Sequence, residues 1–119
     1  KYILYRKDRI KKIHSKIKKF VIKKNMGWCD DPKSKYYNRL IYFPFKFGAE
    51  KLYMKKKIYD FILVLDFNTE PIKKGAGSAI FLHLSDKNFK ATKGCISVRK
   101  IDFLKILKKI NRKTNLIIN

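Results

Sequence analysis

The stretch GSAIFLHLSDKNFKATKGCISV, residues 77–98, decides the predicted fold of this chain. Residues 78–84 form a short apolar run between glycines and the polar residues 86–88, which is the pattern of a buried strand. Residues 94–98, GCISV, indicate a second short strand that begins with a glycine. The order of these two segments predicts that the strands are neighbours in one sheet.

The same stretch holds a candidate nucleophile and a candidate base. Cys95 lies in the second strand directly after Gly94, and His83 lies near the end of the first. Cysteine attacks as the thiolate, and a free thiol with a pKa of about 8.5 needs a nearby imidazole to ionise at neutral pH. The pair therefore predicts a thiol nucleophile activated by histidine. The structural alternative is a small buried cysteine and a core histidine.

Around these residues the sequence resembles a known active-site signature. GSAIFLHL followed by TKGCISV is similar to the L,D-transpeptidase (YkuD-type) catalytic domain, whose usual form ends Ser/Thr-His-Gly-Cys. Thr92, Gly94 and Cys95 match this form. Lys93 stands where the family commonly has histidine, and the gap back to His83 is short, as in the short-gap branch. Further similarity covers most of the chain: YRKDR at 5–9, GWCDDP at 27–32, YN at 37–38 and YDFILVLDFN at 59–68.

The resemblance implies a fold and an activity. The fold is mainly β, an L,D-transpeptidase-like β-sandwich with one C-terminal amphipathic helix. Residues 1–119 are expected to be a single catalytic domain that lacks its N-terminal strands, because the chain begins abruptly. The implied activity is that of a peptidoglycan L,D-transpeptidase in the cell envelope or periplasm. It would act through a cysteine acyl-enzyme on stem tetrapeptides, releasing D-Ala and forming cross-links. With water as acceptor it would be an L,D-carboxypeptidase.

The resemblance also assigns roles to residues of this sequence. Cys95 is the nucleophile, and His83 is the base toward the thiol and then the acid toward the leaving amine. Backbone N–H groups at Gly94 and Cys95 are the expected donors to the oxyanion. Thr92 and Lys93 are assigned to substrate binding, although Lys93 would either contact a stem carboxylate or point to solvent. The sequence identifies no third member of a triad.

Residues 25–38, NMGWCDDPKSKYYN, have turn chemistry and predict a surface loop. Two interpretations of this segment remain open. Its aromatic residues either cover the edge of the core or line a peptide-binding cleft beside Cys95. In the second interpretation the substrate-binding residues are Trp28, Tyr36, Tyr37 and Asn38. Cys29 is expected to have a packing role.

The rest of the chain predicts ordinary packing elements. Residues 9–24 favour a loop and then a strand, and residues 58–67 form the longest strand, with both faces covered. Residues 115–119 predict a final short strand. A helix over residues 99–110 is expected to lie on the sheet through residues at helical spacing: Ile101, Leu104, Leu107 and Ile110.

Composition leaves a second class of function open. With 31 basic and 9 acidic residues the formal net charge is +22, which suits a non-enzymatic basic β module that binds a polyanion through lysines. The excess of Lys, Ile and Asn is also typical of an AT-biased coding sequence, so the charge alone does not predict nucleic-acid binding. The resemblance implies peptidoglycan stem peptides as partners and no nucleic acid. No run approaches the roughly 18 apolar residues of a membrane span. The cysteines and histidines lack zinc spacing, so no metal or other cofactor is implied.

Overall fold

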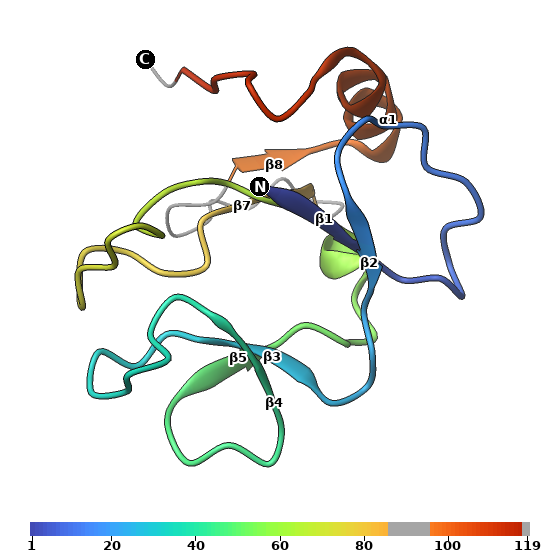
Figure 1. Cartoon of the computed structure of the whole chain (residues 1–119). Helices are drawn as coiled ribbons and strands as arrows, with labels where there is room; N and C mark the ends of the chain where they lie inside the picture. Colours follow the sequence, from blue (N-terminus) through green and yellow to red (C-terminus); the bar gives the residue numbers. More distant parts are fainter. Residues whose placement is uncertain (86–95, 118–119) are drawn as a thin grey trace.

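The computed structural model describes residues 1–85 and 96–117. Strands make up most of the regular structure in this part of the chain, together with one α-helix and one short 3-10 helix (Figure 1). The elements follow in this order: β1 (Tyr2–Tyr5), β2 (Lys19–Val21), β3 (Met26–Cys29), β4 (Leu40–Tyr42), β5 (Ala49–Lys51), η1 (Lys57–Tyr59), β6 (Phe61–Val64), β7 (Phe81–Leu84), β8 (Ile96–Val98) and α1 (Lys100–Lys109).

Five of these strands form a mixed sheet in the order β2-β1-β6-β7-β8. The central pairs β1–β6 and β6–β7 are antiparallel, whereas β1–β2 and β7–β8 are parallel. In the β7–β8 pair, His83 lies opposite Ser97. The prediction that these two strands are neighbours is therefore confirmed. The remaining strands form a small antiparallel sheet in the order β4-β3-β5.

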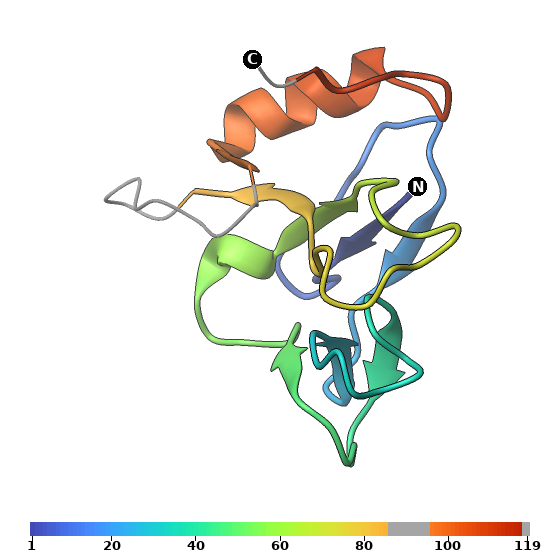
Figure 2. The same ribbon diagram turned by 90° about the vertical axis from the view of Figure 1, so that its left-hand side faces the viewer.

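The five-stranded sheet lies between the small sheet and α1 (Figures 1 and 2). One apolar core fills the space toward the small sheet and the other lies under the helix. Strand β6 serves both: Ile62 and Val64 belong to the first core, and Phe61 and Leu63 to the second. The prediction of a strand covered on both faces is confirmed, although the strand is shorter than residues 58–67 because η1 occupies its expected start.

Helix α1 confirms the predicted amphipathic helix and most of its predicted buried face, since Leu107 is buried and Leu104 and Ile110 pack against the same core. Phe103 and Leu107 are fully buried, and the Phe103 ring stacks on Phe61 with centroids 5.4 Å apart. Ile101 is 58% exposed. Residues four apart share one face of a helix, so an anchor at Phe103 turns the side chain two residues earlier away from the sheet.

Two strand predictions are corrected by the structure. Residues 26–29, expected in a surface loop, form the fully buried strand β3, because β4 and β5 pair with it on both sides. Residues 115–117, expected in a final strand, are exposed and form no strand, and 118–119 lie outside the described residues. Strand β2, in contrast, confirms the expected loop and strand within residues 9–24.

Candidate functional site

His83 lies on β7, an inner strand with β6 on one side and β8 on the other. Its neighbours Leu82 and Leu84 belong to the core under α1, while Phe81 belongs to the core toward the small sheet. Side chains alternate along a strand, so the imidazole shares the face of Phe81. It is only 5% exposed. The fold therefore holds this ring inside the protein rather than at its surface.

A backbone carbonyl orients the His83 ring. Nδ1 of His83 lies 2.8 Å from the carbonyl oxygen of Leu84. A carbonyl oxygen only accepts hydrogen bonds, so Nδ1 carries the proton and donates it. The lone pair of the neutral ring is then on Nε2, which becomes the basic nitrogen. No side-chain pattern could have revealed this partner, since every residue has a carbonyl.

Tyr59, at the end of η1, packs against the His83 ring. The two ring centroids are 5.5 Å apart and the planes are nearly perpendicular, at 84°. The Tyr59 hydroxyl donates to Oε1 of Glu50 on β5, at 3.2 Å. Burial raises the pKa of Glu50, an effect that this hydrogen bond partly offsets. A buried aromatic residue thus connects the imidazole to the small sheet, and sequence reasoning gave Tyr59 no role at the site.

Strand β8 pairs with β7 on the side away from β6, next to His83. Its register places Ser97 opposite His83, and the Ser85 amide donates to the Val98 carbonyl at 2.8 Å. In the sequence, Cys95 directly precedes this strand. Cys95 and the other predicted loop residues, Thr92, Lys93 and Gly94, lie outside the described residues.

The structure gives the predicted cleft residues Trp28 and Asn38 buried positions in the fold. The Trp28 indole N–H donates to Oδ1 of Asn38 at 3.0 Å, and its ring packs edge-on against Phe81 at 5.1 Å. The same Oδ1 accepts the Ala79 amide at 3.2 Å, and the Asn38 side-chain amide donates to the carbonyls of Phe67 and Asn68. Asn38 therefore ties β3 to the segment that leads into β7.

The tyrosines of the same segment divide between interior and surface. Tyr37 is buried, and its hydroxyl accepts the Gly77 amide at 3.0 Å. Tyr36 is exposed and packs against Phe45. Cys29, with its side chain fully buried, has the packing position that was expected. Tyr37 thus stabilises the segment that leads into β7, the strand that carries His83.

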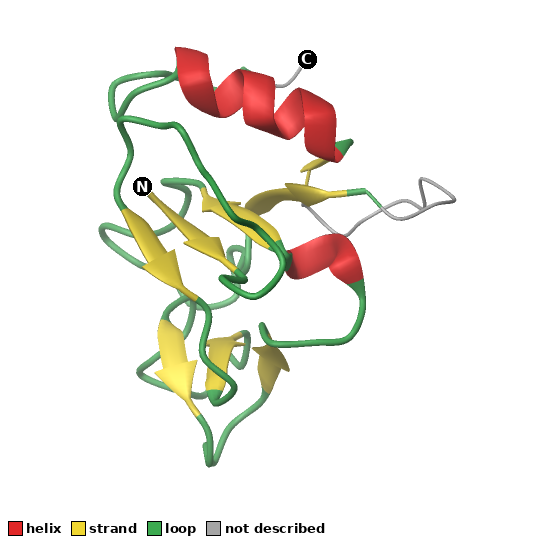
Figure 3. Ribbon diagram, turned by 90° about the vertical axis from the view of Figure 1, so that its right-hand side faces the viewer, coloured by secondary structure: helices red, strands yellow, loops and turns green. Residues whose placement is uncertain are grey.

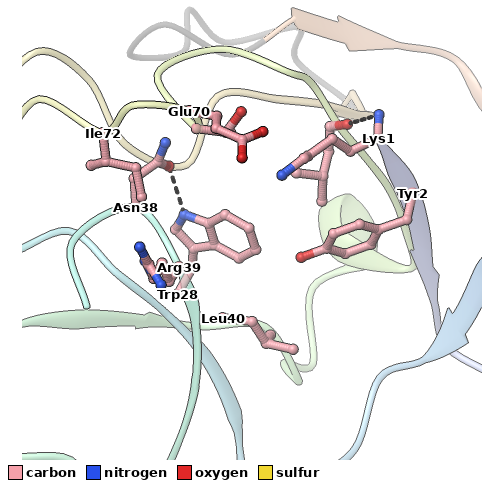
Figure 4. Close-up of a pocket in the computed structure, with 10 residues that line it drawn as sticks. Lys1, Tyr2, Trp28, Asn38, Arg39, Leu40, Glu70 and Ile72 are labelled. Carbon is pink, nitrogen blue, oxygen red and sulfur yellow. Dashed lines mark hydrogen bonds between the residues drawn. The ribbon is translucent and has the colours of Figure 1, made fainter. Parts of the chain in front are cut away.

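A cavity of about 310 Å³ lies beside Trp28 and Asn38 (Figure 4). Its other lining residues come from β1, β4, β6, the residues just before β1 and β4, and the segment after β6: Lys1, Tyr2, Arg39, Leu40, Val64, Thr69, Glu70 and Ile72. This is the edge of the large sheet where β1 begins and β6 ends. The Leu84 carbonyl that orients His83 lies at the other end of β7. The structure therefore brings Trp28 and Asn38 to one cavity. This cavity lies at the end of β7 opposite to the Leu84 carbonyl that orients His83.

A second groove, of about 440 Å³, lies at the end of β7. It is lined by Arg9, Lys57, Asp60, Leu84, Ser85 and Lys100. This groove begins at the residue whose carbonyl holds the His83 ring.

Within residues 1–85 and 96–117, no group of three His, Cys, Asp or Glu side chains is placed to hold a metal ion. The described part also contains no helix long and apolar enough to cross a membrane.

Comparisons with known proteins identify no relative: no protein-family model, no curated protein and no solved structure matches the chain.

Proposed function

We propose that this protein is a cysteine-dependent acyltransferase, a peptidoglycan L,D-transpeptidase with an L,D-transpeptidase-like β-sandwich fold. The observation that carries the proposal is the hydrogen bond from His83 Nδ1 to the Leu84 carbonyl, which leaves Nε2 as a base. This base lies on a strand paired with β8, the strand that Cys95 precedes. The similarity of residues 77–98 to the family signature supports the same assignment.

The proposed reaction has two acyl-transfer steps. Nε2 of His83 accepts the Cys95 thiol proton, and the thiolate attacks the carbonyl that joins the L-centre of a diamino acid to D-Ala. The C–N bond breaks, D-Ala leaves as an amine with the proton from His83, and a thioester remains. An amine of a second stem then attacks the thioester and restores the thiol. N–H groups of Gly94 and Cys95 would stabilise the oxyanion, with Thr92 and Lys93 at the substrate.

The fixed orientation of the buried His83 ring supports its proposed role as the base. The His83 ring is held by a hydrogen bond and by Tyr59, so it would not have to be ordered during the reaction. If water replaces the acceptor amine, the same chemistry makes the protein an L,D-carboxypeptidase.

The proposal is tested by turnover of a stem tetrapeptide with an acceptor stem, followed by mass spectrometry of cross-linked and hydrolysed products. Cys95→Ala is expected to abolish both products. The matched control is Cys29→Ala, which removes the other thiol from a fully buried site and should leave substantial turnover if the protein stays folded. Undiminished turnover by Cys95→Ala would exclude the nucleophile assignment. Absence of turnover in the folded wild type would favour the polyanion-binding alternative, which the net charge of +22 suggests.

A further inference from the structure

Three basic side chains from separate parts of the chain line the groove at the end of β7. Arg9 follows β1, Lys57 opens η1 and Lys100 is the first residue of α1. Figure 3 shows η1 and the first turn of α1 on either side of the end of β7. The only acidic residue among the described lining residues is Asp60. The described lining residues therefore carry an excess of positive charge.

Asp60 is already neutralised by one of these cations. Its carboxylate accepts from Arg9 Nη1 at 2.7 Å, and its side chain is 7% exposed. The same guanidinium nitrogen donates to the carbonyls of Met54 and Lys56. Neither Lys57 nor Lys100 forms an ion pair with any described residue. Within the described residues, no carboxylate pairs with these two lysines on the groove walls.

The position of Lys100 is not explained by helix stability. The N-terminal end of a helix carries a partial positive charge, which disfavours a cation in the first turn. Arg99, at the N-cap, is offset by Asp102 at 2.9 Å, but Lys100 has no such partner in the described part of the chain. A bound anion would offset the charge of Lys100 and the helix end together.

The groove is also next to the proposed base. Leu84 lines it, and the carbonyl of Leu84 accepts the His83 hydrogen bond. The short helix η1 contributes Lys57 to the groove and places Tyr59 against the imidazole. The groove is thus connected to His83 through Leu84 and through η1.

We propose that this groove is an anion-binding subsite that receives a carboxylate of the acyl-donor peptide. Its volume of about 440 Å³ falls in the roughly 300–1,000 Å³ range of small-ligand sites. The charges of Lys57 and Lys100 suit one or two carboxylates, whereas an extended polyanion requires a long basic stripe. The inference rests on the proposed function for the identity of the ligand, but its binding is measured separately from turnover.

The test measures binding to Cys95→Ala protein, in which turnover is prevented, with two peptides as probes. One is L-Ala-D-Glu-diamino acid-D-Ala with free carboxylates, and the other has its carboxylates amidated. Lys57→Gln combined with Lys100→Gln is expected to weaken binding of the first peptide by about tenfold at low salt and to change the second little. The matched control, Lys105→Gln combined with Lys109→Gln, removes the same charge from exposed positions of α1 and should have little effect.

Equal binding by the two double variants would overturn the proposal. So would a groove variant that loses affinity for inorganic phosphate but binds the free-carboxylate peptide normally, since the site would then serve a free anion. Failure of the proposed function has a different signature. In that case Cys95→Ala retains turnover, whether or not peptide binding depends on Lys57 and Lys100.

Discussion

The Nδ1 atom of His83 lies 2.8 Å from the carbonyl oxygen of Leu84, the next residue along the same strand. The base proposed for this protein is therefore oriented by the backbone of the strand that carries it. A carbonyl oxygen only accepts hydrogen bonds, so of the two neutral tautomers of His83 it selects the one that is protonated on Nδ1. The expected consequence is a thiol whose reactivity depends on this one imidazole.

Acylation by a carbapenem should reveal that dependence. A strained acyl donor should form one covalent adduct at Cys95, detected by intact-mass spectrometry and absent in Cys95→Ala. His83→Ala is expected to slow the adduct at neutral pH and to recover part of the rate as pH rises through about 8.5, where a free thiol ionises unaided. An adduct confined to Cys29, or no adduct with folded protein, would contradict this prediction.

Glu50 gives a prediction for stability against pH. Burial raises the pKa of Glu50 in the folded protein above its ordinary value of 4.5. The folded state then holds this proton more tightly than the unfolded chain, so the contribution of Glu50 to stability falls as pH rises from about 4.5 toward neutrality. Glu50→Gln keeps an acceptor for Tyr59 but cannot ionise.

The thermal midpoints of wild type and Glu50→Gln, measured from pH 4 to pH 7, test this prediction. The other carboxylates titrate in both proteins, so the difference between the curves isolates Glu50. We expect the two midpoints to lie close together at pH 4 and the variant to be the more stable at pH 7. Parallel curves over this range would show that Glu50 pays no desolvation cost in the folded protein.

Asn38 is predicted to be a major contributor to stability. Asn38→Gly removes the acceptor of the Trp28 indole and the donor to two carbonyls, at a cost of about 2–4 kcal/mol in the free energy of unfolding. Asn38→Ala should cost about 1 kcal/mol more, because the φ of 57° at this position disfavours a Cβ.

Urea denaturation of both Asn38 variants gives these values. Asn115→Ala, a change at an exposed asparagine, is the control and should lie within about 0.5 kcal/mol of wild type. If Asn38→Gly is as stable as the control, the hydrogen bonds of Asn38 do not hold β3 to the segment before β7.

Gly27 is predicted to tolerate no side chain. A Cβ there would lie 2.6 Å from Cε2 of Phe43 and 2.8 Å from the Glu50 carbonyl oxygen, so Gly27→Ala must displace the small sheet. We expect a loss of about 1–3 kcal/mol in the free energy of unfolding. Gly48→Ala is the matched control, because its nearest contact would be 3.4 Å, to Asp30 Oδ1. Equal stability of the two variants would refute the packing argument.

The sequence pattern predicted those strands whose burial is visible as an apolar run within the strand itself. The apolar run before residue 85 and the short run ending at Val98 indicated two neighbouring strands, and the structure pairs β7 with β8. The alternating faces of β6 were also predictable, because burial on both sides leaves a continuous apolar run. The roles of Cys95 and its preceding loop stay predictions from the resemblance.

Pattern was insufficient where neighbours from elsewhere in the chain decide burial. Trp28 lies among turn-forming residues, and only pairing with β4 and β5 makes it an interior residue. The helix after β8 was predictable as a helix. The burial of Phe103 in place of Ile101 depends on packing against Phe61, which is 42 positions away (103 − 61).

The candidate site shows the same division. The sequence by itself determined that a cysteine and a histidine lie near two adjacent strands, because strand pattern and spacing are local properties. Only the tertiary structure decided which ring nitrogen of His83 contacts the Leu84 carbonyl, and that Lys57 and Lys100 share one groove. A carbonyl partner leaves no mark in the residue types. Lysines far apart in sequence meet only when the strands and helices between them have packed.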